Sequence, residues 1–316
     1  MHLTVSILIV NYNTCKMTID CIHSIFEQSE NIDFEVIVVD NASTDGSAEA
    51  IAAEFPRLKL FPSKKNLGFA GGNNLAATAA HGDYLLLLNP DTVVLDHAVD
   101  RLVAFARQNP NAGIWGGKTV FENGELNPTS CWRFMTLWSL VTQVTGLSRL
   151  FARSDFFNPE AYGGWSRDFE REVEIVSGCF LLVDHALWER LNGFDEHFFM
   201  YAEEADLCYR AKQSGARPLF TPKATIIHYG GASEKVFSAK VVKLFTGKIT
   251  FIAKHWTPLR QKIGIKLFEL SVITRVVGYA VAAFLTSSTA HQHATQQWRT
   301  IWSQRVEWKK SIHPKT

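Results

Sequence analysis

The chain has 316 residues, of which 47% are hydrophobic and 20% charged, a composition typical of a globular protein and not of a disordered one. Its formal net charge of +1 provides no general attraction for nucleic acid, so we expect no nucleic-acid partner. Five scattered cysteines without a C-x-x-C pair argue against a zinc or redox motif and predict reduced thiols in a cytoplasmic protein.

The first ninety residues alternate between short apolar runs and helical segments. The apolar runs cover 5–10, 34–39, 58–61 and 84–88, and the helical segments cover about 16–28 and 71–80, with another ending near residue 54. Short apolar runs bounded by turn residues and separated by helices predict an α/β fold with a mostly parallel central sheet, covered on both faces.

Polar residues follow three of these runs, at Asn11-Tyr12-Asn13, at Asp40-Asn41 and at Asn89-Pro90-Asp91. In open α/β sheets, ligands bind beyond the carboxyl ends of the strands, so we expect these side chains to line one crevice. Asp91 could hold a divalent cation there, although Asn-Pro-Asp is also a common turn sequence. Asp40 could equally be only a cap for the following helix.

Residues 122–174 interrupt this regular pattern with a segment rich in aromatic residues, including Trp132 and Trp165. Such a segment is either a binding surface, here for an acceptor, or a helical subdomain with its own core. A further apolar run over 175–183, a helix over about 184–191 and a strand over 224–228 follow. This last strand ends in His228, which is either a metal ligand or a core histidine.

Three carboxylates, Glu203, Glu204 and Asp206, fall within one helical turn between aromatic residues. Like charges this close raise at least one pKa and disfavour a purely structural role. One of the three is suited to be a general base that deprotonates an acceptor hydroxyl.

The region 238–316 is basic and helical, and it contains an apolar stretch over 263–285 that Lys266, Glu269 and Arg275 interrupt. Charges in the middle of such a stretch disfavour a membrane-spanning helix. We therefore expect an amphipathic helix that attaches the protein peripherally to the inner face of the cytoplasmic membrane. Packing of this helix against the rest of the protein is the alternative.

Six sequence blocks occur in a recognisable order, at 5–13, 38–45, 66–73, 88–92, 193–210 and 228–231. Together they resemble the family 2 glycosyltransferases of the GT-A fold, in particular the bacterial rhamnosyltransferase-like branch. The resemblance covers about residues 5–233. It implies a GT-A catalytic domain over 1–237, with the aromatic segment 122–174 as an insertion, and a helical C-terminal extension over 238–316.

The resemblance also implies roles for the polar strand ends. Asp40 would contact the base or ribose of a nucleotide, with Asn11 and Asn13 in the same pocket, and Asn66, Gly68 and Asn73 would form the wall beside the ribose and donor sugar. Asp91 matches the second acid of the family's D-x-D motif, while Asn89 replaces the first acid. This leaves Asp91 and His228 as the main protein ligands of a divalent cation, Mn²⁺ or Mg²⁺.

Glu204 falls where the family usually places its catalytic Asp, and Glu203 and Asp206 remain candidates for the base. Trp132 and Trp165 are the candidates for stacking on an acceptor sugar. A glycosyltransferase with these residues would be metal-dependent and inverting, using a nucleotide-diphosphate sugar as donor and a glycan or lipid-linked oligosaccharide as acceptor, in bacterial cell-surface polysaccharide synthesis.

The donor preferred by the resemblance is dTDP-rhamnose, and the alternative is a UDP-sugar carrying galactose, glucose or an N-acetylhexosamine. A non-catalytic subunit that binds a sugar nucleotide or glycan is a rival of another class. A nucleotidyltransferase is disfavoured because residues 11–15 contain no Gly-rich basic loop after the first strand.

Overall fold

The computed structural model describes residues 4–230 and 236–312. The described residues form two compact units, and each is considered by itself. The first unit contains 4–132, 166–199 and 203–230, and the second contains 133–165, 200–202 and 236–312. Most of the aromatic segment thus clusters with the C-terminal helices, whereas the functional division at residue 237 stays a prediction. Gly231, in the last sequence block, lies outside the described residues.

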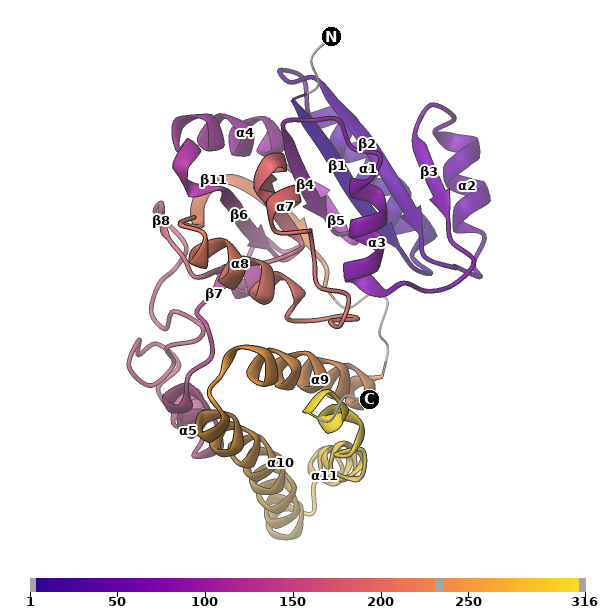
Figure 1. Ribbon diagram of the computed structural model, residues 1–316. Coiled ribbons are helices and arrows are strands. Elements are labelled where there is room, and N and C mark those ends of the chain that lie inside the picture. Colours follow the sequence, from indigo (N-terminus) through magenta and orange to yellow (C-terminus); the bar gives the residue numbers. More distant parts are fainter. Residues whose placement is uncertain (1–3, 231–235, 313–316) are drawn as a thin grey trace. The chain divides into compact units, whose positions relative to one another are not determined.

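The first unit is built on a sheet that has nine strands among the described residues (Figure 1). The strands are β1 (Val5–Asn11), β2 (Phe34–Asp40), β3 (Lys59–Pro62), β4 (Tyr84–Leu88), β5 (Thr92–Val94), β6 (Ile114–Val120), β8 (Arg171–Glu172), β10 (Phe180–Asp184) and β11 (Leu219–His228). Their order is β3-β2-β1-β4-β10-β6-β11-β5, with β8 also paired to β11. A small separate pair joins β7 (Cys131–Trp132) to β9 (Ile175–Val176).

The expected α/β fold is confirmed, and its parallel part lies where the sequence placed it. β3, β2, β1 and β4 are parallel neighbours, and β6 and β11 form a second parallel pair. β10 enters antiparallel between β4 and β6. The apolar run over 175–183 is divided because the chain turns at Ser177, whose carbonyl accepts from the Phe180 amide. β10 therefore begins at the edge where β4 ends.

Six α-helices of the first unit surround this sheet: α1 (Cys15–Gln28), α2 (Ser47–Glu54), α3 (Gly68–Ala77), α4 (Ala98–Gln108), α7 (His185–Arg190) and α8 (Glu203–Gln213). Alternate residues of β1 face opposite sides, as strand geometry requires. Ile7 and Ile9 join a buried cluster with Ile22 and Ile25 of α1. On the other face, Val10 occupies the space beside Gly72 of α3, where a Cβ atom would lie 2.7 Å from a Val10 methyl carbon.

Helix α3 begins at Gly68, three residues earlier than the sequence predicted. A local and a tertiary hydrogen bond stabilise the early start: the Gly68 amide donates to Asn66 Oδ1 at 2.8 Å, and the Phe69 amide donates to the Phe199 carbonyl at 2.9 Å. Gly68 itself has φ of +73°, and a Cβ atom there would lie 2.1 Å from the Phe199 carbonyl oxygen. Only glycine can therefore occupy this position without displacing Phe199.

The second unit is helical and has its own apolar core. Its helices are α5 (Leu137–Val144), α6 (Leu147–Leu150), α9 (Phe237–His255), α10 (Pro258–Thr286), α11 (Thr289–Ser303) and the 3₁₀ helix η3 (Glu307–Ile312). Phe245 packs edge-on against both Phe268 and the fully buried Trp308. Glu269 pairs with Lys266 and Lys309 at 2.9 and 2.6 Å, so one interrupting charge of α10 is used to hold η3. Two further 3₁₀ helices, η1 (Pro110–Ala112) and η2 (Pro128–Ser130), lie in the first unit.

Candidate functional site

The carboxyl ends of β1 and β2 bring Asn11 and Asp40 directly opposite each other. The Asn11 amide nitrogen donates to Asp40 Oδ1 at 2.6 Å, and both side chains are buried. The Asn11 oxygen accepts from the hydroxyls of Thr14 and Thr18 at 2.7 and 2.8 Å. With every polar group of Asn11 engaged, the Asp40 carboxylate is held at the strand end in one orientation.

Asn13 closes the same edge from the loop after β1, in a left-handed conformation with φ of 53°. Its side-chain oxygen accepts from the Thr44 amide at 2.8 Å, and its own amide donates to Ser43 Oγ at 2.9 Å. Ser43 also accepts from Asn11 and donates its backbone amide to Asp40. The loops after β1 and β2 therefore form one polar, partly exposed rim.

Asn41 connects this rim to the N-terminus of α3. Its amide nitrogen donates to Asn66 Oδ1 at 3.1 Å and to the Gly68 carbonyl at 2.9 Å, and its oxygen accepts from the Leu67 amide. Asn66 and Gly68 thus lie beside the strand ends, and their role as a wall for a ribose and donor sugar stays a prediction. Asn73 is buried, and its amide donates to the Phe69 carbonyl within the same helix at 2.9 Å.

A second polar group gathers where β4 and β11 end. The His228 Nε2 atom lies 3.4 Å from Asp91 Oδ1 and 3.3 Å from the Asn89 amide nitrogen. The Asn89 backbone amide donates to the Cys179 carbonyl at 3.1 Å, which fixes Asn89 to the start of β10. The structure therefore brings Asn89, Asp91 and His228 together from two strand ends more than a hundred residues apart in sequence.

These three residues fit a divalent cation in part. Ligand atoms about 2.1 Å from one octahedral ion are roughly 3 Å apart, which is close to the observed separation of Asp91 Oδ1 and His228 Nε2. Carboxylate and imidazole ligands suit Mn²⁺, and the Asn89 amide could present its oxygen by a flip. Within residues 4–230 and 236–312, no group of three His, Cys, Asp or Glu side chains forms a complete cage. An ion here would take its remaining ligands from substrate and water.

Burial lowers the pKa of His228, but Cys179 and Asp91 raise it by more, to about 10. When no cation is bound, the imidazole is therefore protonated at neutral pH, because Asp91 stabilises its positive form. A cation bound at Nε2 would replace this proton, so metal binding at this site would release a proton. The Nδ1 atom is buried and has no hydrogen-bond partner among the described residues.

The turn between β9 and β10 connects this group to the acids of α8. Cys179 lies beside His228, and Gly178 precedes it. A Cβ atom at Gly178 would lie 3.9 Å from Glu204 Cβ and 3.1 Å from the Phe69 ring, so this glycine leaves space between α3 and α8. Glu204 thus lies beside Gly178, and His228 lies beside Cys179, the next residue of the same turn.

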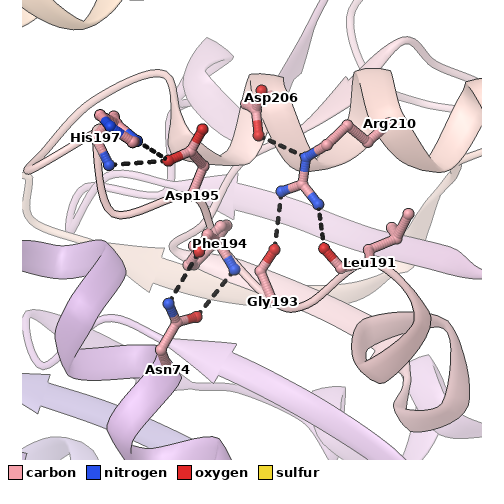
Figure 2. Close-up of polar contacts among 8 residues, drawn as sticks. All are labelled: Asn74, Leu191, Gly193, Phe194, Asp195, His197, Asp206 and Arg210. Atoms are coloured by element: carbon pink, nitrogen blue, oxygen red, sulfur yellow. Dashed lines mark hydrogen bonds and ion pairs between the residues drawn. The ribbon is translucent and has the colours of Figure 1, made fainter.

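The first turn of α8 buries all three predicted acids, and they have different surroundings. Burial and the adjacent Glu204 raise the pKa of Glu203 well above its usual range. The Glu203 Oε2 atom has no hydrogen-bond partner within the described part of the chain. Asp206, which is completely buried, is bound to Arg210 Nε at 2.7 Å (Figure 2). Asp206 thus already has a cationic partner, whereas Glu203 and Glu204 form a close pair of acids.

The two tryptophans predicted to stack on sugar lie in different compact units. Trp132 is half-buried in β7 and pairs with Ile175. Trp165 is only 9% exposed and packs edge-on against Tyr162, and the Arg133 guanidinium lies over the Tyr162 ring. Little of the Trp165 ring surface is therefore open to a ligand in this structure, and a role in acceptor binding stays a prediction.

Sequence reasoning missed several residues that organise this site: Ser43, Asn74, Cys179 and Arg210. Ser43 and Arg210 lie inside the sequence blocks, and Asn74 directly follows one, so position in a block was the available signal. Cys179 carried no signal, because an apolar run with one cysteine is typical of any buried strand.

A protein-family model described as glycosyl transferase family 2 matches residues 6–173. The chain is 28% identical over 213 residues to the N-acetylglucosaminyl-diphospho-decaprenol L-rhamnosyltransferase of Mycobacterium tuberculosis, covering 61% of this chain and 66% of that protein. It is 27% identical over 187 residues to the rhamnosyltransferase WbbL of Escherichia coli K12, covering 56% and 66%. The matched region also spans 16% of the O-antigen biosynthesis protein RfbC of Myxococcus xanthus, at 29% identity. The chain therefore spans less than two thirds of the length of these relatives.

Among solved structures, the fold is similar to that of the mannosyltransferase PcManGT from Pyrobaculum calidifontis in complex with GDP-Man and Mn²⁺. The TM-score is 0.60 at 16% identity, with coverage of 100% of this chain and 89% of that chain. Residues 1–349 of Staphylococcus aureus TarS give a TM-score of 0.53 at 15% identity, covering 98% and 81%. At these identities the likeness shows a common GT-A fold.

The buried acid pair leads to a prediction about stability. Because the folded state raises the pKa of Glu203, folded protein holds the proton more tightly, and stability falls as the pH rises above the unfolded pKa of about 4.5. Glu203→Gln is therefore expected to increase the free energy of unfolding at pH 7, with the gain vanishing near about pH 4. Urea denaturation at pH 7 and at about pH 4 measures the free energy of unfolding, with Glu189→Gln at an exposed position on α7 as the control. Equal effects of the two substitutions at pH 7 would contradict the prediction.

Proposed function

Since the chain belongs to glycosyl transferase family 2, in its rhamnosyltransferase-like branch, we propose that it is a metal-dependent inverting glycosyltransferase. The observation that carries this proposal is the convergence of three polar groups at one edge of the sheet. These are the Asn11–Asp40 pair, the Asn89–Asp91–His228 group and the buried acids that begin α8. Nucleotide, cation and general base each have a candidate there.

The donor's nucleoside would lie against the rim of β1 and β2. Asp40 can accept hydrogen bonds from a base or ribose, and it is already oriented by Asn11 and Ser43. The wall formed by Asn66 and Gly68 would bound the ribose and sugar, with glycine allowing close approach of the backbone. Asp91 and His228 would hold Mn²⁺ or Mg²⁺, which supplies charge neutralisation for the departing diphosphate.

Glu204 is the proposed general base. It would take the proton of an acceptor hydroxyl while the hydroxyl oxygen attacks the anomeric carbon and the bond to the diphosphate breaks. A single displacement of this kind inverts the anomeric configuration. Glu203 lies beside Glu204 in the first turn of α8, and burial together with Glu204 raises the pKa of Glu203. The proposed donor is dTDP-rhamnose because the relatives include rhamnosyltransferases; a UDP-sugar donor is the alternative.

The second unit supports a peripheral attachment to the inner face of the cytoplasmic membrane, where a lipid-linked acceptor would be reached. Residues 236–312 contain twelve Lys and Arg against two Glu, a net charge of +10 in a chain whose total is +1. Helix α10 is long and apolar enough to span a membrane, by length and composition, and 17% of its most apolar window is buried. The Glu269 carboxylate is engaged by Lys309, and the Arg275 guanidinium lies 5.0 Å from the Trp298 ring centroid.

With these two charges used for packing, the exposed side chains of α10 are largely apolar. They include Leu259, Ile263, Leu270, Val277, Val281, Phe284 and Leu285. An apolar helix surface on a strongly basic unit is typical of a helix that lies in the interface of an anionic bilayer. This pattern favours peripheral attachment over a membrane-spanning helix.

The first prediction from this function concerns the donor and metal. At about a hundredfold over its dissociation constant, the true donor should add about 2.7 kcal/mol to the free energy of unfolding. We expect dTDP-rhamnose with Mn²⁺ to raise the melting temperature, and we expect a chelator or Asp91→Ala to remove most of this shift. A shift with UDP-sugars alone would identify a UDP-sugar as the donor and leave the proposed mechanism unchanged. The absence of a shift with dTDP-rhamnose and with every UDP-sugar would favour a role without nucleotide-sugar binding.

The base is tested by Glu204→Gln, which preserves shape and removes proton affinity. We expect transfer to fall by about a hundredfold to ten-thousandfold while the donor-induced thermal shift is retained. Gln213→Ala, exposed on the same helix, is the matched control and should leave turnover unchanged. Wild-type turnover in Glu204→Gln would assign the base to another residue. A wild-type protein that binds donor and never transfers would indicate a binding subunit.

Membrane attachment is tested by replacing Phe284 and Leu285, which are 86% and 73% exposed, with serine. The fraction of protein recovered with anionic vesicles should fall about tenfold or more, because each side chain contributes on the order of 1.5–3 kcal/mol when fully buried. The control replaces exposed Gln292 and His293 on α11 with serine. If both double variants were recovered with the vesicles to the same extent, at low and at high salt, the proposed membrane attachment would be wrong.

A further inference from the structure

We propose that Asn74 and Arg210 are positioning residues that fix the loop between α7 and α8, and that this loop couples the donor wall on α3 to the acids of α8. The inference rests on the proposed function, in which α3 bounds the donor and α8 supplies the base. It assigns Asp206 to this positioning assembly and leaves the base to Glu203 or Glu204.

The first tie is a double hydrogen bond between a side chain and a peptide backbone. The Asn74 amide nitrogen donates to the Phe194 carbonyl at 2.9 Å, and the Phe194 amide donates to Asn74 Oδ1 at 2.9 Å (Figure 2). The same nitrogen lies 3.2 Å from Glu196 Oε1. A carboxamide that satisfies both backbone groups of one residue replaces a strand partner and fixes the loop in position and direction.

The N-terminal turn of α3 provides a second tie to the same loop. The Phe69 amide donates to the Phe199 carbonyl at 2.9 Å, and the rings of Phe69 and Phe194 lie 5.9 Å apart. Gly68 allows this approach because it has no Cβ atom to meet Phe199. The segment of α3 that would bound the donor is therefore bonded to both ends of the loop segment 194–199.

Arg210 ties the beginning of the loop to α8. Its Nη1 and Nη2 atoms donate to the carbonyls of Leu191 and Gly193 at 2.6 and 2.8 Å, while Nε pairs with Asp206 (Figure 2). The planar guanidinium can reach three acceptors at once, which a lysine ammonium on a flexible stem does not reproduce. Asp206 is completely buried, so its charge requires this partner.

The contacts of Asn74 and of Arg210 with the loop meet at Gly193. This residue has φ of +63°, and a Cβ atom there would lie 2.5 Å from Asn74 Oδ1. Its carbonyl accepts from Arg210, and the next amide donates to Asn74. Helices α3 and α8 are thus connected through two consecutive loop residues. A donor that orders α3 would also order the backbone leading to Glu203 and Glu204, nine and ten residues beyond Phe194.

The principal test is Asn74→Ala in the full chain, compared with Thr78→Ala, an exposed residue that follows α3. Loss of the two hydrogen bonds between Asn74 and Phe194 should lower kcat by about tenfold or more. Donor affinity should stay within about twofold of wild type, because the donor-binding groups remain in place. Amide hydrogen exchange in residues 192–199 should accelerate. Thr78→Ala should match the wild type in both measurements. Arg210→Lys, which keeps a cation beside Asp206, should also lower kcat with donor affinity retained.

The outcomes separate the inference from the proposed function. Unchanged kcat in both Asn74→Ala and Arg210→Lys would overturn the coupling, as would equal losses of donor affinity and kcat, which indicate general destabilisation. Unchanged exchange in Asn74→Ala would overturn the tie itself, and this measurement needs no activity. A wild-type chain that binds no nucleotide sugar would overturn the proposed function and the coupling together, whatever the exchange result.

Discussion

The site depends on the parallel register of β1 and β2, which sets Asn11 opposite Asp40. A shift of the register by one residue would turn each side chain of the shifted strand to the opposite face and would move Asn11 away from Asp40. The register therefore determines that Asn11 and Asp40, the polar residues that end the two strands, lie side by side. Asn11 then joins Asp40 to Thr14 and Thr18, so the end of the strand, the start of α1 and the polar rim form one bonded structure.

The antiparallel entry of β10 has an equally large effect on the chemistry. A parallel strand beside β4 would end at this edge, whereas β10 begins there and brings the turn at Gly178 and Cys179 with it. Cys179 contacts His228 and accepts from the Asn89 amide, while Gly178 leaves room beside Glu204. The cation candidates and the acid pair are thus organised by one short turn. Burial and the adjacent Glu204 raise the pKa of Glu203, whereas Cys179 and Asp91 raise the pKa of His228 against the opposing effect of burial.

The division of charge and polarity between the two units suits a chain with two environments. The first unit concentrates its buried polar groups at the strand ends, whereas the second combines a net positive region with the exposed apolar side chains of α10. The second unit has a buried core of its own around Phe245 and Trp308. Under the proposed function, the first unit would meet an aqueous nucleotide sugar and the second a lipid surface.

The strands of the parallel sheet, the polar residues at their ends and the acids of α8 could be predicted from the amino-acid sequence, because apolar periodicity and turn chemistry are local properties. The six blocks also identified the family. The pairing of Asp206 with Arg210, the burial of Trp165 and the packing of residues 133–165 with the C-terminal helices became known only from the folded structure. The bond between Asn74 and Phe194 joins residues 120 positions apart. Such contacts depend on how loops close and strands order, and no local pattern encodes them.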